Sequence, residues 1–120
     1  MPVRFDRPLK LKEIHDFCWY DGNLYLATSQ GLFESHPIRK KEGKDDFVLC
    51  TLNPEPLIKG KVANLCTDGK TNLYFSVNQG KVMHYDLVTK TASLIKEYSV
   101  VNRLFLRHGY LWICRLWDDI

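Results

Sequence analysis

The chain has 120 residues, a formal net charge of +3, 45% hydrophobic residues and 26% charged residues. This hydrophobic content is enough for a packed core and too high for an intrinsically disordered chain, and the length fits one domain. The weak positive charge lacks the clustered basic face of a nucleic-acid-binding protein, so no nucleic acid is expected as a partner. Met1 to Phe5 begin no long apolar run, which predicts a cytoplasmic protein without signal peptide or membrane span.

The N-terminal segment, residues 1–13, is expected to form one strand. Apolar and charged residues alternate from Val3 to Glu13, around Leu9 and Leu11. Pro8 lies in this run, and a proline favours an edge strand or a bend because it donates no hydrogen bond to a ladder.

A first unit is predicted over residues 14–53. Asp21-Gly22 is typical of a tight turn, and the strand from Asn23 follows it with the residues NLYL. Gln30-Gly31 predicts a second turn. The charged insert from Ile38 to Asp46 is interpreted as a solvent-exposed loop.

A second unit, residues 62–97, has four predicted strands. Turn residues separate them at Asp68-Gly69, at Asn78-Gln79-Gly80 and over residues 86–90. Short strands at regular spacing predict an antiparallel meander. A meander of this size has two apolar faces and needs neighbours to be stable. The strands are Val62 to Thr67, Asn72 to Val77, Lys81 to Asp86 and Thr91 to Glu97.

A third, partial unit is predicted over residues 101–120. Strands are expected at Val101 to Arg107 and Tyr110 to Arg115, with His108-Gly109 as the turn between them. Leu116 to Ile120 would form a short third strand. A fourth strand is missing from this unit.

The three units resemble one another and resemble the blades of known β-propellers. A period of roughly 40 to 45 residues with four strands each is that of propeller blades. The pattern is similar to blades of the NHL, quinoprotein-like and two-component-regulator types, most clearly at Gly31-Leu32-Phe33 and at Tyr85 to Thr89. No Trp-Asp pair ends a third strand, so the units are not identified as WD40 repeats. The resemblance implies an all-β chain of about three four-stranded antiparallel meanders, the last one incomplete.

Three blades are fewer than the four to eight of a closed propeller. One hypothesis is a homodimer that makes a six-bladed ring, in which residues 3–13 of each copy complete the last sheet of the other. The alternative is that the chain is a fragment of a longer propeller, whose remainder completes the ring. Both alternatives stay open at this point.

The resemblance also implies where a ligand would bind. Propeller sites usually lie at the central channel, and the matching positions on the first strand of each unit are Asp16, Asn64 and Arg103. In six-bladed lactonase-like propellers, such carboxylates and amides bind a divalent cation. Asp16 and Asn64 suit that role and Arg103 opposes it, whereas an Arg near an Asp suits an anionic or peptide ligand. The alternative is that all three are polar groups lining the channel or supporting turns. No metal site and no cofactor is predicted.

The cysteines and the recurring aromatic residues are interpreted as parts of the packed core, and the histidines form no recognisable site. The cysteines have no CxxC spacing, and Cys18 and Cys66 share one position of the repeat, so reduced thiols in an apolar environment are expected. Tyr25, Tyr74 and Trp112 share another position and predict an aromatic core between units. The four histidines fall at unrelated positions, and no catalytic triad or phosphate loop is visible.

These observations leave two classes of function. The first is a non-enzymatic propeller scaffold that engages a protein or small ligand at the channel face. The second is a metal-dependent hydrolase of the six-bladed, lactonase-like kind, using Asp16 and Asn64. A fold of this type hosts both classes, so the fold alone does not choose between them.

Overall fold

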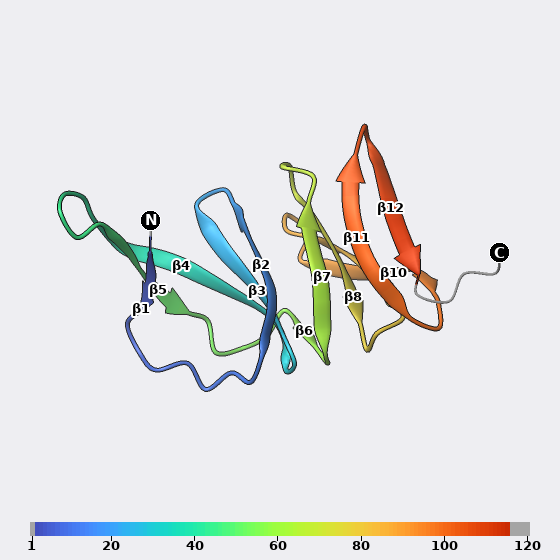
Figure 1. The fold of residues 1–120 in the computed structure, drawn as a ribbon, viewed down its shortest axis with the longest axis horizontal. Helices are drawn as coiled ribbons and strands as arrows, with labels where there is room; N and C mark the ends of the chain where they lie inside the picture. Colours follow the sequence, from blue (N-terminus) through green and yellow to red (C-terminus); the bar gives the residue numbers. More distant parts are fainter. Residues whose placement is uncertain (1, 116–120) are drawn as a thin grey trace.

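The computed structural model describes residues 2–115, which form β-strands and turns without any helix. The expectation of an all-β protein is therefore confirmed. The strands make three sheets that lie side by side along the longest dimension of the molecule, which measures 52 × 31 × 29 Å (Figure 1). Within the described residues, nothing helical is available to cross a membrane.

The first sheet contains six strands from the N-terminal half of the chain. Five of them follow one another across the sheet in the order β1-β5-β4-β3-β2, and β6 pairs with one end of β4. All neighbours are antiparallel except β1 and β5, which run parallel. The strands are β1 (Val3–Phe5), β2 (Ile14–Tyr20), β3 (Asn23–Thr28), β4 (Gly31–Lys41), β5 (Phe47–Leu52) and β6 (Ile58–Lys59).

The second sheet is an antiparallel meander, and the third is a hairpin. The second contains β7 (Val62–Thr67), β8 (Asn72–Val77), β9 (Lys81–Asp86) and β10 (Thr91–Glu97); the third contains β11 (Val101–Arg107) and β12 (Tyr110–Arg115). All six strands coincide with the predicted ones. The strand predicted at residues 116–120 lies outside the described residues.

Two hairpins are closed by the turn chemistry that the sequence predicts. Asp21 and Gly22 have φ values of 50° and 80°, and His108 and Gly109 have 54° and 78°. Two successive positive φ values make a turn whose twist matches that of the flanking strands. Aspartate and histidine enter this region more readily than most residues, and glycine enters it at little cost.

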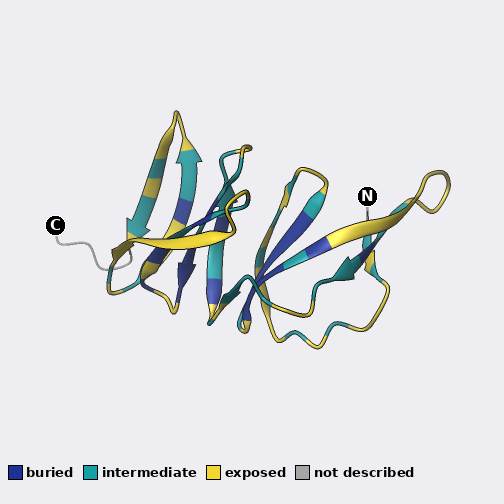
Figure 2. Ribbon diagram, turned by 180° about the vertical axis from the view of Figure 1, so that it is seen from behind, coloured by how far each residue is buried: buried dark blue, intermediate teal, exposed yellow. Residues whose placement is uncertain are grey.

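The core lies between the sheets, and its centre is the row of strands β2, β7 and β11. We call these the first strands, because each begins one of the predicted units. β2 packs against β7, and β7 packs against β11. The cluster between the first and second sheets is built on Tyr25, Leu65 and Phe75, and the cluster between the second and third on Val82 and Leu104. Figure 2 shows the buried residues concentrated on these facing strands, whereas β10 is exposed along its whole length. Each sheet therefore buries its apolar side chains against a neighbour.

The prediction of one strand over residues 3–13 is wrong in extent. Only Val3–Phe5 form a strand, and it lies parallel to β5 in the first sheet. Residues 6–13 then cross the outer side of this sheet, where Leu11 helps to cover the buried Leu24 and Leu26. In this chain the segment does not reach the third sheet, because an apolar face close to it in the sequence is available for burial.

The predicted loop from Ile38 to Asp46 is also wrong. β4 continues to Lys41 and β5 begins at Phe47, so only residues 42–46 form the connection. The extended hairpin keeps its backbone groups paired, with Arg39 opposite Leu49 and Lys41 opposite Phe47. The charged residues remain exposed, as the sequence suggests, but they stand on paired strands.

Candidate binding surfaces

The strands β2, β7 and β11, with which the three predicted units begin, each carry an irregularity at the same place in the repeat. The pairing register shifts between Ile14 and Asp16 in β2, between Ala63 and Cys66 in β7, and between Val101 and Arg103 in β11. Such β-bulges bend a strand, increase its twist and re-aim one side chain. The three predicted channel residues, Asp16, Asn64 and Arg103, all lie at these bulges.

Asp16 connects the first two sheets. Its Oδ2 accepts a hydrogen bond of 2.9 Å from the backbone N–H of Leu65 in β7, and its Oδ1 accepts one of 2.9 Å from the N–H of Phe17. Leu65 lies within the bulge of β7, where regular pairing with β8 is interrupted. The carboxylate therefore supplies a partner that the neighbouring strand cannot supply, and both of its oxygens are engaged.

Asn64 stabilises the bulge of its own sheet. Its φ of 55° is in the left-handed region, which asparagine tolerates better than most residues. Its Nδ2 donates to Ser76 Oγ at 3.0 Å, and that hydroxyl donates to the carbonyl of Ala63 at 3.2 Å. The amide is thus held within the second sheet.

Arg103 is exposed, and its guanidinium carbon lies 5.3 Å from the centre of the Phe105 ring. The three positions are thus used differently: Asp16 joins two sheets, Asn64 supports a bulge, and Arg103 stacks on an aromatic ring. Within residues 2–115, no group of three or more His, Cys, Asp or Glu residues is placed to hold a metal ion. Ligand binding by Asp16, Asn64 and Arg103 remains a prediction.

The two equivalent thiols lie beside the Asp16 carboxylate. All four cysteines are free, and Cys18 and Cys66 pack against the two clusters between the sheets. Burial and the negative charge of Asp16 raise the pKa of Cys18 to about 12, and the same two causes raise the pKa of Cys66 to about 11. Both thiols are therefore protonated and poor nucleophiles at neutral pH.

The histidines of the third strands make local contacts in separate sheets. His36 Nε2 lies 3.1 Å from Glu34 Oε1 in the first sheet. In the second sheet, the ring of His84 bonds to Asn72 Oδ1 and packs on Tyr74, with 5.3 Å between the ring centres. These contacts assemble no shared site.

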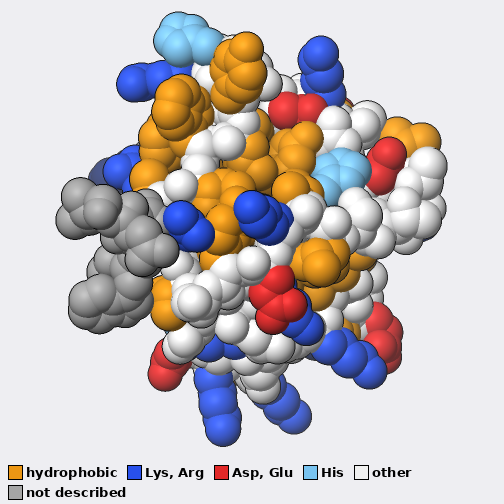
Figure 3. All heavy atoms as spheres, turned by 90° about the vertical axis from the view of Figure 1, so that its right-hand side faces the viewer, with side chains coloured by type: hydrophobic (Ala, Val, Ile, Leu, Met, Phe, Trp, Pro, Cys, Tyr) orange, Lys and Arg blue, Asp and Glu red, His pale blue; other side chains and the backbone are white. Residues whose placement is uncertain are grey.

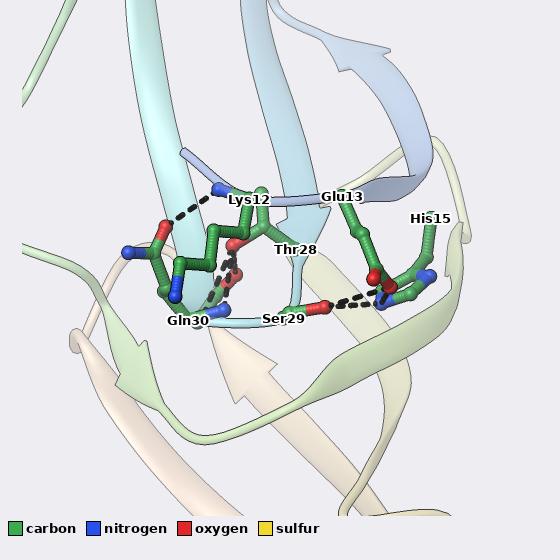
Figure 4. A network of polar contacts seen from close by, with 7 residues as sticks. Lys12, Glu13, His15, Thr28, Ser29 and Gln30 are labelled. Atoms are coloured by element: carbon green, nitrogen blue, oxygen red, sulfur yellow. Dashed lines mark hydrogen bonds and ion pairs between the residues drawn. The ribbon is translucent and has the colours of Figure 1, made fainter. Parts of the chain in front are cut away.

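A network of polar contacts fixes the chain where it enters β2 (Figure 4). Gln30 Oε1 accepts a hydrogen bond of 2.9 Å from the N–H of Lys12. His15 Nε2 lies 2.8 Å from Ser29 Oγ, and this hydroxyl donates to Glu13 Oε2 at 3.3 Å. The network anchors the crossing segment to the turn between β3 and β4. A half-open hollow of about 650 Å³ remains between this segment and β4–β5, lined by residues that include Phe5, Leu11, Phe33 and Leu52.

The surfaces that sequence reasoning missed are the two outer sides of the stack. On the first sheet, the exposed Phe17 and Trp19 of β2 form what we call the front face. On the third sheet, Phe105, Tyr110 and Trp112 form what we call the rear face, where the Phe105 and Trp112 rings stack with centres 6.2 Å apart. Figure 3 shows hydrophobic side chains gathered on the third-sheet end of the molecule, with Lys and Arg side chains among them.

The rear face corrects the prediction of a continuous aromatic core. Tyr25 is 3% exposed and Tyr74 is half-buried, but Trp112, at the same position of the repeat, is 49% exposed. The reason is the order of the sheets. Within the described residues, the second sheet covers Tyr25 and the third sheet lies beside Tyr74, whereas no further sheet follows Trp112. The sequence showed that these three aromatic residues share one position of the repeat, but it did not show which repeat unit lacks a neighbouring sheet.

Comparison of the chain with protein-family models, curated proteins and solved structures finds no significant match. The interpretation of its function consequently rests on its own residues and sheets.

Proposed function

We propose that this chain is a non-enzymatic binding module of the β-propeller type, which engages a protein or small ligand at the channel side of its first strands. The observation that carries the proposal is the row β2, β7 and β11, in which each strand packs against the next and each is bulged at the same repeat position. A row of first strands is what lines the channel of a propeller.

The contacts of Asp16 favour binding over metal-assisted catalysis. A carboxylate that holds a divalent cation must turn its oxygens toward the ion. Both oxygens of Asp16 instead accept backbone hydrogen bonds, from Phe17 and from Leu65. The exposed guanidinium of Arg103 supplies positive charge at the corresponding position, which suits an anionic group on a ligand.

A thermal-shift measurement with Ca²⁺, Mg²⁺, Mn²⁺ and Zn²⁺ tests the proposal against the hydrolase alternative. The melting temperature is expected to stay the same with each ion, because a ligand stabilises a protein only when it binds the folded state. A stabilisation that is present in the native protein and absent in the Asp16→Asn variant would overturn the non-enzymatic reading. The Asp45→Asn variant, changed at an exposed position of the β4–β5 connection, is the matched control.

A further inference from the structure

The two interfaces inside the chain are built the same way. Leu65 in β7 faces the first sheet, and Leu104 in β11 faces the second; each is 6% exposed. Phe17 occupies the same position in β2, but it is 60% exposed. Each of β2, β7 and β11 therefore carries one large apolar side chain at this position. In β7 and β11 it packs on the preceding sheet, and in β2 it is exposed.

The receiving surfaces are also equivalent. The pairs of opposed residues Cys18 and Tyr25 in the first sheet, and Cys66 and Tyr74 in the second, lie on the faces turned toward the following sheet. The corresponding pair in the third sheet is Phe105 and Trp112. This pair lies on the rear face, where Tyr110 beside it is 70% exposed.

We propose that the rear face binds the front face of a second copy of this chain, head to tail, so that Phe17 of one copy packs on Phe105 and Trp112 of the other. The proposal rests on the proposed propeller-type architecture and names its partner. It repeats the β2 part of the two existing interfaces, because Leu11 of the crossing segment already covers Leu24 and Leu26 on the same face of the first sheet. Two copies joined in this way at both ends would contribute six sheets, within the usual range for a closed ring.

The composition of the two faces fits a protein contact. Exposed aromatic residues that cluster at one place are typical of the buried centre of an interface. Arg103 and Arg107 stand on the same side of β11 as Phe105, because side chains alternate along a strand. The Arg103 guanidinium lies over the Phe105 ring, so positive charge stands next to the apolar centre.

The first test is the mass of the native chain, measured by light scattering after size exclusion at protein concentrations from about 0.1 to 100 µM. The expected result is a dimer that does not grow further at the highest concentration. A monomer over the whole range would overturn the proposal, and so would a series of larger open oligomers.

Charge substitutions test the direction of the contact. Phe17→Glu and Trp112→Glu should each weaken dimerisation at least about 100-fold, because each places an unpaired carboxylate in a desolvated contact. Tyr110→Glu is a second rear-face variant, and Leu94→Glu, on the exposed β10 at 54% exposure, is the matched control that should stay dimeric. Circular dichroism and urea unfolding establish that each variant is folded.

Mixing the two monomeric variants separates the head-to-tail contact from a symmetric one. A mixed dimer of Phe17→Glu with Trp112→Glu keeps one junction of native composition, so mixing should restore part of the dimer. If two rear faces instead pair with each other, Phe17→Glu alone would remain dimeric and the proposal would be wrong. The metal measurement does not depend on dimerisation, so a failure of this inference is distinguishable from a failure of the proposed function.

Discussion

The carboxylate of Asp16 in β2 accepts a hydrogen bond of 2.9 Å from the backbone N–H of Leu65 in β7. These residues stand 49 positions apart in the chain and belong to different sheets. A backbone donor left in a bulge needs a partner when it is partly buried, and here that partner comes from the neighbouring sheet. The contact therefore couples the stability of the second sheet to its position beside the first.

We expect Asp16→Ala to lower the free energy of unfolding by about 1.5–3 kcal/mol, the range for a hydrogen bond to a charged group. Asp16→Asn keeps one acceptor oxygen and should cost less. Urea denaturation measures both values. The control Asp45→Ala, in the exposed β4–β5 connection, should change the value by less than about 0.5 kcal/mol. Equal effects of the two alanine variants would contradict a bridging role for Asp16.

Asp68 makes the stability of the second sheet depend on pH. Partial burial raises its pKa, but hydrogen bonds from the Asn72 side chain and from the N–H groups of Lys70 and Asn72 outweigh it and hold the pKa below the usual range. A lowered pKa in the folded state means that the carboxylate form stabilises the fold. This contribution is present above the unfolded pKa of about 3.9 and is lost as the pH falls through the folded pKa.

The difference in unfolding free energy between the native chain and Asp68→Ala should accordingly be constant from about pH 5 to pH 7 and shrink below about pH 4. Urea denaturation over this range provides the measurement. A difference that grows on acidification would show that the sign is wrong.

The thiols of Cys18 and Cys66 should be protected in the folded protein. A pKa of about 12 leaves only about one Cys18 side chain in ten thousand as thiolate at pH 8, and a pKa of about 11 leaves about one Cys66 side chain in a thousand. Cys50 is fully buried and should also be protected, whereas the half-buried Cys114 in β12 provides the internal comparison. Iodoacetamide added to the dilute folded protein should modify Cys114 first. Peptide mass spectrometry identifies the labelled cysteines. Denaturant should abolish the difference among the four.

Gly80 lies where the backbone of a later segment passes close to it. A Cβ atom placed there would lie 2.0 Å from the carbonyl oxygen of Tyr98, which is far inside contact distance. Gly80→Ala should therefore cost about 3 kcal/mol, the upper end of the usual range for overpacking a buried site. Gly22 has open space around it, so Gly22→Ala pays only for its positive φ, at about 1 kcal/mol. Thermal and urea unfolding of the two variants should rank them in this order.

Two predictions about the first sheet were wrong because each relied on a local signal in the sequence. Alternation of apolar and charged residues is a local signal, and it cannot say which face is available for burial. Residues 6–13 cross the first sheet, where the side chain of Leu11 packs on buried residues, and Val3–Phe5 pair with β5. The insert from Ile38 was interpreted as a loop because of its charge, but an exposed strand tolerates charge on both sides as long as its backbone is paired.

The sequence by itself determined the all-β class, the six strands from Val62 to Arg115 and the turns at Asp21 and His108, because strand propensity and positive φ depend on residues next to one another. It also placed Asp16, Asn64 and Arg103 at one position of a repeat, and Phe17, Leu65 and Leu104 follow them directly in the chain. Only the tertiary structure decided that Leu65 and Leu104 are buried while Phe17 is exposed, and that Asp16 bonds to the next sheet. Those outcomes depend on which sheets stand beside each other, and the pattern within one strand carries no information about its neighbours.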